Sequence, residues 1–255
     1  MAIKLQETSI MKLKLENISF AYAKKAKMIF EDFSFELKEN SFNMLLGPNG
    51  TGKSTLINIL NGAFTPTNGK VLLNDINIKD ISPIARAKNI ATVFQTPNIL
   101  QDITVTELVM LGRNPFRNRF TNPKKDDFQA VEEAIETMAL TPIAHSPYPT
   151  LSGGEKQRVM IAQSLARKSN FLLLDEPTSA ADPNFRGYIM EKLKSLSWKP
   201  GILVVTHDVM AAKTFAENVI LLKDGKIITQ GTAKDIINLQ NITQLYGQYA
   251  SWLVK

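Results

Sequence analysis

Residues 47–54 read Gly47-Pro-Asn-Gly-Thr-Gly-Lys-Ser54, and they lie between the apolar run Phe42 to Leu46 and a stretch with helical periodicity. The pattern G-x-x-x-x-G-K-[ST] between a strand and a helix predicts a phosphate loop. The N–H groups of such a loop turn inward around an anion, and the helix N-terminus adds its positive dipole end. A glycine-rich turn without a ligand is the alternative, but chance gives the four fixed residues in only about one such chain in a hundred.

The loop predicts contacts with a nucleotide and its metal ion. We expect Lys53 to reach the β- and γ-phosphates and the Ser54 hydroxyl to coordinate Mg²⁺. The residues predicted to bind the nucleotide here are Gly47, Pro48, Asn49, Gly50, Thr51, Gly52, Lys53, Ser54 and Thr55.

Apolar patterns on both sides of the loop predict an α/β fold. Buried strands are indicated by the apolar runs at 42–46, 91–94, 171–174 and 202–206, with helical patterns between them. Near the C-terminus, Asp224-Gly225 joins two short apolar segments, which is typical of a hairpin. These features predict a P-loop NTPase core with a mainly parallel sheet.

The N-terminal residues alternate between apolar and polar side chains. The alternation over 12–22 and 32–37 indicates half-buried strands, with Phe33, Phe35 and Leu37 on one face. We therefore expect an antiparallel β part before the phosphate loop.

Between Thr104 and Arg167 the apolar residues recur at helical spacing. One stripe with intervals of three and four residues consists of Phe128, Val131, Ile135 and Met138. Three prolines within 142–149 predict a loop that leads into a helix at Ser152. This segment predicts an inserted α-helical subdomain.

The apolar run at 171–174 ends in two adjacent acids, Asp175 and Glu176. Carboxyl ends of strands are where α/β proteins place ligand chemistry. We expect Asp175 to hold Mg²⁺ through its water shell and Glu176 to act on the water that attacks the γ-phosphate. A solvated strand end is the alternative, which the phosphate loop disfavours.

A second glycine pair lies in the segment Leu151-Ser-Gly-Gly-Glu-Lys-Gln-Arg158. Ser152 as the N-cap of a helix, with Gly153 and Gly154, predicts a second anion site. Ser152 with Glu155 is also an ordinary capping box, and that alternative stays open.

Composition describes an ordinary globular chain of 255 residues, with 44% apolar and 21% charged residues. The absence of Cys excludes disulfides and thiolate metal sites. The net charge of +6 comes from scattered basic residues without interleaved aromatic residues, so no nucleic acid is expected as a partner. The apolar runs are too short to span a membrane, and the first 20 residues do not resemble a secretory signal.

The segments GPNGTGKST, LSGGEKQR and LLLDEP, in that order, resemble the ATP-binding subunits of ABC transporters over essentially the whole chain. The resemblance implies one ABC ATPase domain over 1–255. Within it we expect a RecA-like core at about 1–95 and 168–240, a helical subdomain at about 96–167 and a C-terminal tail at 241–255.

The resemblance implies roles for four further residues. Tyr22 matches the aromatic residue that stacks on adenine, Asp182 the D-loop acid, and His207 the switch histidine near the γ-phosphate. Gln95 matches the Q-loop residue that touches Mg²⁺ and water. Burial in the core is the alternative for Tyr22, and a polar strand end is the alternative for Gln95. The implied catalytic residues are Glu176, His207, Gln95 and Lys53, and the implied Mg²⁺ ligands are Ser54, Gln95 and Asp175.

In this family two subunits pack head to tail, which implies a homodimer. ATP on the phosphate loop of one chain is then covered by Ser152, Gly153 and Gly154 of the other. A single copy of each motif means that one chain cannot complete a site.

The segment Gly112-Arg-Asn-Pro115 is similar to a G-R-x-P element in importers of iron chelates, haem and cobalamin. It implies a separate permease that contacts the helical subdomain and Q-loop region, an extracytoplasmic binding protein, and a peripheral place on the cytoplasmic face of the inner membrane. A ferric siderophore is the first expected cargo, with haem or cobalamin as alternatives. A soluble ABC protein of the iron-sulfur scaffold type is the rival.

Two residues depart from the common family pattern. Ala181 stands in the D-loop where Leu is usual, which implies a weaker packing contact across the dimer. Glu155 stands in the signature where Gln is most common, a variation associated with this importer group.

Overall fold

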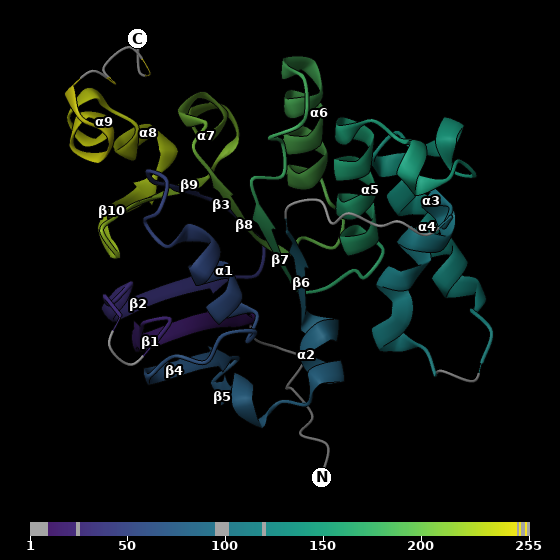
Figure 1. The fold of residues 1–255 in the computed structure, drawn as a ribbon, viewed down its shortest axis with the longest axis horizontal. Coiled ribbons are helices and arrows are strands. Elements are labelled where there is room, and N and C mark those ends of the chain that lie inside the picture. The colour runs from purple at the N-terminus through teal and green to yellow at the C-terminus, as the bar shows by residue number, and fades with distance from the viewer. Residues whose placement is uncertain are drawn as a thin grey trace.

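Two β-sheets pack on the helix that follows the phosphate loop, and a group of helices flanks the larger sheet (Figure 1). The computed structural model describes residues 10–23, 26–94, 102–118, 121–248, 250 and 253. The expected α/β architecture is confirmed.

The larger sheet has six strands in the order β10-β9-β3-β8-β7-β6, and all neighbours are parallel except β9 and β10. Its strands are β3 (Ser41–Leu46), β6 (Ile90–Val93), β7 (Phe171–Asp175), β8 (Gly201–Thr206), β9 (Asn218–Lys223) and β10 (Lys226–Thr232). Helices cover both faces, and so the central strands are continuous apolar runs. The register pairs Leu46 with Thr206 and Asp175 with Val205, which brings the carboxyl ends of β3, β7 and β8 to one edge.

The smaller sheet is antiparallel, with the order β2-β1-β4-β5. Its strands are β1 (Lys12–Phe20), β2 (Phe30–Lys38), β4 (Asn68–Leu73) and β5 (Ile76–Asn77). The predicted shared face of Phe33, Phe35 and Leu37 is confirmed, because all three are buried. Strands β4 and β5 were not predicted, since their short segments carry no clear alternation.

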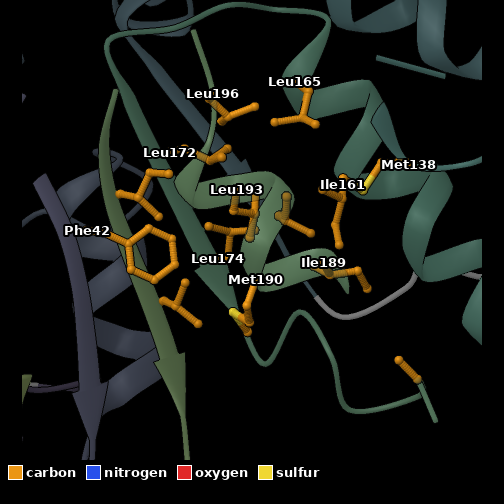
Figure 2. Close-up of a cluster of buried hydrophobic side chains, with 14 of the residues drawn as sticks. Phe42, Met138, Ile161, Leu165, Leu172, Leu174, Ile189, Met190, Leu193 and Leu196 are labelled. Carbon is orange, nitrogen blue, oxygen red and sulfur yellow. The ribbon is translucent and has the colours of Figure 1, made fainter. Parts of the chain in front are cut away.

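The helices of the core are α1 (Lys53–Leu60), α2 (Pro83–Asn89), α6 (Pro183–Lys194), α7 (Val209–Phe215), α8 (Ala233–Ile236) and α9 (Leu239–Tyr246). Helix α1 lies between the two sheets, where its apolar side, Leu56, Ile57, Ile59 and Leu60, is fully buried. A second cluster joins the other face of the large sheet to α6 and to α5 (Gly153–Leu165), for example through Leu172, Ile161 and Ile189 (Figure 2).

The described residues between 102 and 167 form the helices α3 (Val105–Met110), α4 (Lys125–Thr137) and α5 (Gly153–Leu165) with 3₁₀ turns between them. Of the apolar stripe at helical spacing, Val131, Ile135 and Met138 are buried, whereas Phe128 is 55% exposed. Phe128 lies in the first turn of α4, and the neighbouring Asp127 points inward in its place.

Asp127 can be buried because a positive charge and a backbone N–H compensate its negative charge. Its carboxylate lies 2.9 Å from the Arg113 Nε and accepts the N–H of Lys124. Burial alone would raise the pKa of Asp127, but the Lys124 N–H and the Arg113 guanidinium outweigh it and lower the pKa below its ordinary value. A carboxylate can therefore occupy a position that helical periodicity assigns to an apolar side chain.

The end of β6 and the turn between β9 and β10 can also be compared with the sequence patterns. The predicted strand at 91–94 ends at Val93, and Phe94 is exposed. The predicted hairpin is confirmed, with Asp224 and Gly225 both at positive φ in the turn between β9 and β10. Within the described ranges, no helix combines the length and apolar character that a membrane span requires.

Candidate functional site

The phosphate loop runs from the end of β3 to the first turn of α1, and its glycines are required by the fold of the chain itself. Gly52 has a φ of 95°, and a Cβ there would lie 2.7 Å from Ile29 Cγ2. A Cβ on Gly47 would collide with the carbonyl oxygen of Leu222 in β9. Gly50 also has a positive φ, of 79°. A side chain at these positions would strain the backbone or displace its neighbours.

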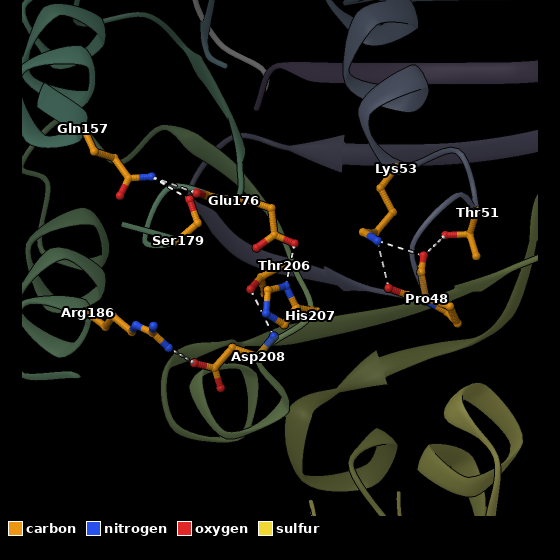
Figure 3. A network of polar contacts seen from close by, with 11 residues as sticks. Pro48, Thr51, Lys53, Gln157, Glu176, Ser179, Arg186, Thr206, His207 and Asp208 are labelled. Carbon is orange, nitrogen blue, oxygen red and sulfur yellow. Dashed lines mark hydrogen bonds and ion pairs between the residues drawn. The ribbon is translucent and has the colours of Figure 1, made fainter. Parts of the chain in front are cut away.

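Lys53 is buried at the centre of the loop. Its Nζ donates to the carbonyl oxygens of Gly47 at 2.8 Å and Pro48 at 2.9 Å (Figure 3). Burial lowers the pKa of Lys53, whereas the negative charges of Glu176 and Asp175 act to raise it. The ammonium group therefore faces two carboxylates across the sheet edge.

The two acids lie at the carboxyl end of β7, next to the phosphate loop, as the parallel register predicts. Asp175 is buried as the last residue of the strand. Glu176 has a φ of 49°, a conformation that costs a non-glycine residue roughly 1–2 kcal/mol. Its N–H donates to Val205 O at 2.9 Å, and this bond to β8 holds the strained turn. The turn directs the carboxylate away from the strand and toward His207.

His207 follows β8, and its Nδ1 lies 2.9 Å from the Glu176 Oε1. The Glu176 side chain is only 16% exposed, whereas that of His207 is 65% exposed. Figure 3 shows this pair opposite Lys53. His207 and Glu176 thus meet at one edge of the sheet, while their chemical roles stay predictions.

The donors around Lys53 fit a hard divalent cation. Ser54 offers an exposed hydroxyl in the first turn of α1, and Asp175 offers a carboxylate close enough to act on the Lys53 charge. Oxygen donors of this kind, completed by phosphate oxygens and water, are what Mg²⁺ prefers. The described residues contain no group of three or more His, Cys, Asp or Glu side chains that could hold a metal ion without such help.

Tyr22 lies beside the phosphate loop rather than in the core. Its hydroxyl is 2.6 Å from the Thr55 Oγ1, and its ring packs edge-on against Phe20 and Phe64. The residue is 63% exposed, which rules out the alternative of a core tyrosine. An exposed aromatic ring fixed at the first turn of α1 can offer a face to a purine.

The second glycine pair begins α5, where both interpretations of Ser152 meet. A complete capping box is present, because the Ser152 Oγ accepts the N–H of Glu155 and the Glu155 carboxylate accepts the Ser152 N–H at 2.8 Å. The Ser152 hydroxyl also donates to that carboxylate and, as the largest cause, lowers the pKa of Glu155. Beside this helix start is a hollow of about 450 Å³ that is lined by Ser152, Gly153, Gly154, Glu155, Arg158, Ala180, Ala181, Asp182 and Phe185.

Gly153 has room for a Cβ, whereas a Cβ on Gly154 would make a tight contact with its own chain. A Cβ on Gly153 would meet nothing nearer than Ala180 Cβ at 3.8 Å, and a Cβ on Gly154 would lie 3.3 Å from Ala180 O. Neither glycine has a positive φ. Asp182 lies at the same hollow as the N-cap of α6, where its Oδ1 accepts the N–H groups of Asn184 and Phe185.

Gln157, for which the sequence predicted no role, links the glycine-rich start of α5 to the acids after β7. Its Nε2 donates to Glu176 O at 2.9 Å and to Ser179 Oγ at 3.2 Å, and its Oε1 accepts the Ala180 N–H (Figure 3). Gln157 is a buried polar residue, and its place inside the segment LSGGEKQR is the feature of the sequence that could have suggested a role for it. Gln95, predicted as a catalytic residue and Mg²⁺ ligand, lies outside the described residues.

Comparison with known proteins agrees with this geometry. The family model described as "ABC transporter" matches residues 30–179. The chain is 35% identical to the ferric enterobactin transport ATP-binding protein FepC of Escherichia coli (strain K12), over 94% of this chain and 88% of FepC.

Solved structures agree as well. A metal-chelate type ABC transporter in an inward-facing conformation matches with a TM-score of 0.79 and 29% identity, over 92% of this chain and 89% of that one. The dimeric post-hydrolysis structure of the ATP-binding cassette MJ0796 with ADP and Pi matches with a TM-score of 0.75 and 30% identity, over 87% and 98%. This protein belongs to the ABC transporter family, as one of its ATP-hydrolysing subunits.

Proposed function

We propose that two copies of this chain hydrolyse ATP at their shared interface and thereby drive uptake of an iron-siderophore type chelate through a separate permease. The observation that carries the dimer is the contrast between the two glycine-rich helix starts. Contacts within the chain enforce Gly47 and Gly52 of the phosphate loop, whereas Gly153 and Gly154 border an open hollow. Bare N–H groups at an exposed helix N-terminus suit an anion brought by another molecule.

The chemistry follows from the residues at the sheet edge. The N–H groups of the phosphate loop and the Lys53 ammonium bind the β- and γ-phosphates of ATP. Glu176 holds the attacking water and accepts its proton, and His207, at hydrogen-bonding distance, orients the Glu176 carboxylate. Ser152, Gly153 and Gly154 of the partner subunit cover the γ-phosphate from the opposite side.

Mg²⁺, which Ser54 and the water shell of Asp175 would hold, supplies positive charge to the β- and γ-phosphate oxygens. Gln95 is proposed as a further ligand. Tyr22 stacks on adenine beside the same loop, and Asp182 lines the hollow that receives the partner's nucleotide.

A groove of about 650 Å³ between α2 and the 3₁₀ helix Leu111–Phe116 supports contact with a permease. Ile84 and Leu111 are exposed beside it, although both are large apolar residues. The buried Nε atoms of Arg117 and Arg167, which also line the groove, form no hydrogen bond with the described residues. A groove that combines exposed apolar side chains with two arginines suits a permease segment with apolar and acidic side chains. Docking there would keep the chain peripheral, on the cytoplasmic face of the inner membrane.

We base the proposed cargo on similarity to known proteins, because contacts within this chain are enough to explain the G-R-x-P element. A Cβ on Gly112 would collide with the backbone oxygen of Gln163, and Arg113 binds Asp127 and the carbonyl oxygen of Ala166. These contacts hold the 3₁₀ helix against α5, whatever the cargo is. Similarity to FepC therefore carries the choice of a ferric siderophore over haem or cobalamin.

The test is co-purification of the tagged chain from membranes of its native host, followed by ATPase assays of the reconstituted complex with its binding protein. We expect a polytopic membrane protein to co-purify and ferric siderophores to stimulate ATP hydrolysis. Stimulation by haem or cobalamin alone would identify that compound, and not a ferric siderophore, as the cargo. Co-purification of only soluble partners would favour a scaffold protein and refute the importer.

A further inference from the structure

Glu176 has a backbone conformation that needs support from outside its own turn. Its φ of 49° lies in the left-handed region, which is unfavourable for a residue with a Cβ. Its N–H donates to Val205 O of β8 at 2.9 Å. Its carbonyl oxygen accepts from the Gln157 Nε2 at 2.9 Å and from the Ser179 N–H at 3.2 Å. Two of these three hydrogen bonds come from other elements, so β8 and α5 hold the backbone of Glu176 from two sides.

The side chain of Gln157 uses both ends of its amide to bind this turn. Its Nε2 also donates to Ser179 Oγ at 3.2 Å, and its Oε1 accepts the Ala180 N–H at 3.1 Å. The residue is only 6% exposed, so water has little access to these bonds. A buried amide whose donor and acceptor are both paired makes the groups that it joins more rigid. Gln157 therefore fixes the segment 176–180 to α5.

The backbone of Glu176 in turn determines where its carboxylate lies. The Glu176 Oε1 is 2.9 Å from the His207 Nδ1. Figure 3 shows the Gln157 amide on one side of Glu176 and His207 on the other. A rotation of the Glu176 backbone would move the carboxylate away from His207 and from the attacking water. Because a displacement of about 1 Å can cost about 10²-fold in rate, a contact that fixes this backbone can control turnover without touching the nucleotide.

We propose that Gln157 is a positioning residue for ATP hydrolysis, which holds the backbone of Glu176 in the conformation that aims its carboxylate at the attacking water. Gln157 acts through Glu176 and binds neither the nucleotide nor the water. The inference rests on the proposed role of Glu176 as the base, and it is independent of the permease and the transported cargo.

The alternative is that Gln157 only stabilises the fold by pairing buried backbone groups. Gln163 offers a matched control, because it lies on the same helix and its Nε2 donates to Leu108 O at 2.9 Å. Substitution by Met removes the amide at either position and keeps the length of the side chain. A structural role predicts that the two variants lose stability and keep turnover. A positioning role predicts a loss of turnover in Gln157→Met alone.

The experiment measures the ATP turnover number kcat, the Kd of a fluorescent ATP analogue and the Tm of full-length Gln157→Met and Gln163→Met. We expect Gln157→Met to lower kcat about tenfold to hundredfold. Its Kd should stay unchanged, because the phosphate loop is intact. Gln163→Met should keep both values. Hydrogen exchange in a peptide covering 176–182 should become faster in Gln157→Met only, since the Ala180 N–H loses its partner there.

Two further variants keep the test decisive. Gln157→Glu retains an acceptor for the Ala180 N–H but offers no N–H to Glu176 O, so it should lose turnover even if Gln157→Met folds poorly. Addition of Gln157→Met to Glu176→Gln should not lower the remaining turnover further, because both substitutions act on the same carboxylate.

Unchanged kcat in the Gln157 variants, or equal losses of kcat in Gln157→Met and Gln163→Met, would overturn the proposal. A further loss in the double variant would overturn it as well. Low turnover in Glu176→Gln with normal turnover in Gln157→Met would refute the positioning role alone. Normal turnover in Glu176→Gln would refute the proposed base, and the role of Gln157 with it.

Discussion

The phosphate loop and the start of α5 are both glycine-rich helix N-termini, but they owe their glycines to different neighbours. In the loop, Gly47 and Gly52 face atoms of β9 and Ile29 that leave no room for a Cβ. At α5, Gly153 and Gly154 face an open hollow. The difference teaches that the conformation of the phosphate loop is fixed by contacts within the chain, whereas the start of α5 leaves space for another molecule.

The largest effect is expected from Lys53→Ala, which removes the charge at the centre of the loop. Charge-assisted hydrogen bonds contribute about 1.5–3 kcal/mol each, so the loss of two phosphate contacts should weaken ATP binding by about 10²-fold or more. Equilibrium binding of a fluorescent ATP analogue measures this. Lys168→Ala, which breaks only the exposed ion pair with Glu133, is the control and should bind normally. Normal ATP affinity in Lys53→Ala would contradict the phosphate-loop assignment.

Alanine at one glycine of each region tests the comparison itself. Gly52→Ala should lower the free energy of unfolding by about 1–3 kcal/mol, because φ is 95° and the Cβ would lie 2.7 Å from Ile29 Cγ2. Gly153→Ala should leave Tm unchanged or slightly raised, since alanine favours a helix and finds space. Its ATPase rate should nevertheless fall on the order of tenfold or more, because its methyl group would displace the partner's nucleotide.

Thermal unfolding and steady-state ATPase assays on both glycine variants give the readout. Full activity in Gly153→Ala would mean that no second molecule approaches this helix start. A large loss of stability there would mean that the glycine serves its own chain.

The smallest effect concerns the capping boxes of α5 and α3. Ser152→Ala and Thr104→Ala should each cost about 1 kcal/mol of stability, because both residues cap a helix with the same pair of hydrogen bonds. Only Ser152→Ala should also reduce ATP turnover. Calorimetry measures the stability of the two variants, and ATPase assays measure their turnover. Equal turnover in both variants would mean that Ser152 only caps its helix.

Local patterns predicted much of the fold and of the site. The phosphate loop, the acids after β7 and the hairpin at Asp224-Gly225 depend on residues adjacent in sequence, and spacing alone identifies them. Parallel strand order then implies that their ends meet at one edge, as Glu176 and His207 do.

What sequence could not reveal depends on approaches between distant segments. Gln157 of α5 donates to the backbone of Glu176 at the end of β7, a contact between two separate elements. Phe128 belongs to the apolar stripe but is exposed, and periodicity does not show that the adjacent Asp127 is buried beside Arg113 instead. In each case a tertiary contact decides the position of the side chain.

The central claim is that Ser152 to Gly154 of one subunit complete the ATP site of the other. Its most direct test is the mass of Glu176→Gln in solution with ATP, measured by sedimentation velocity. This variant should lose about 10²–10⁴-fold in turnover, keep ATP bound and form a stable dimer, whereas addition of Gly153→Glu should leave monomers because it places a carboxylate against the phosphates. A Glu176→Gln protein that stays monomeric with ATP, or a dimer that survives the second substitution, would contradict the shared site.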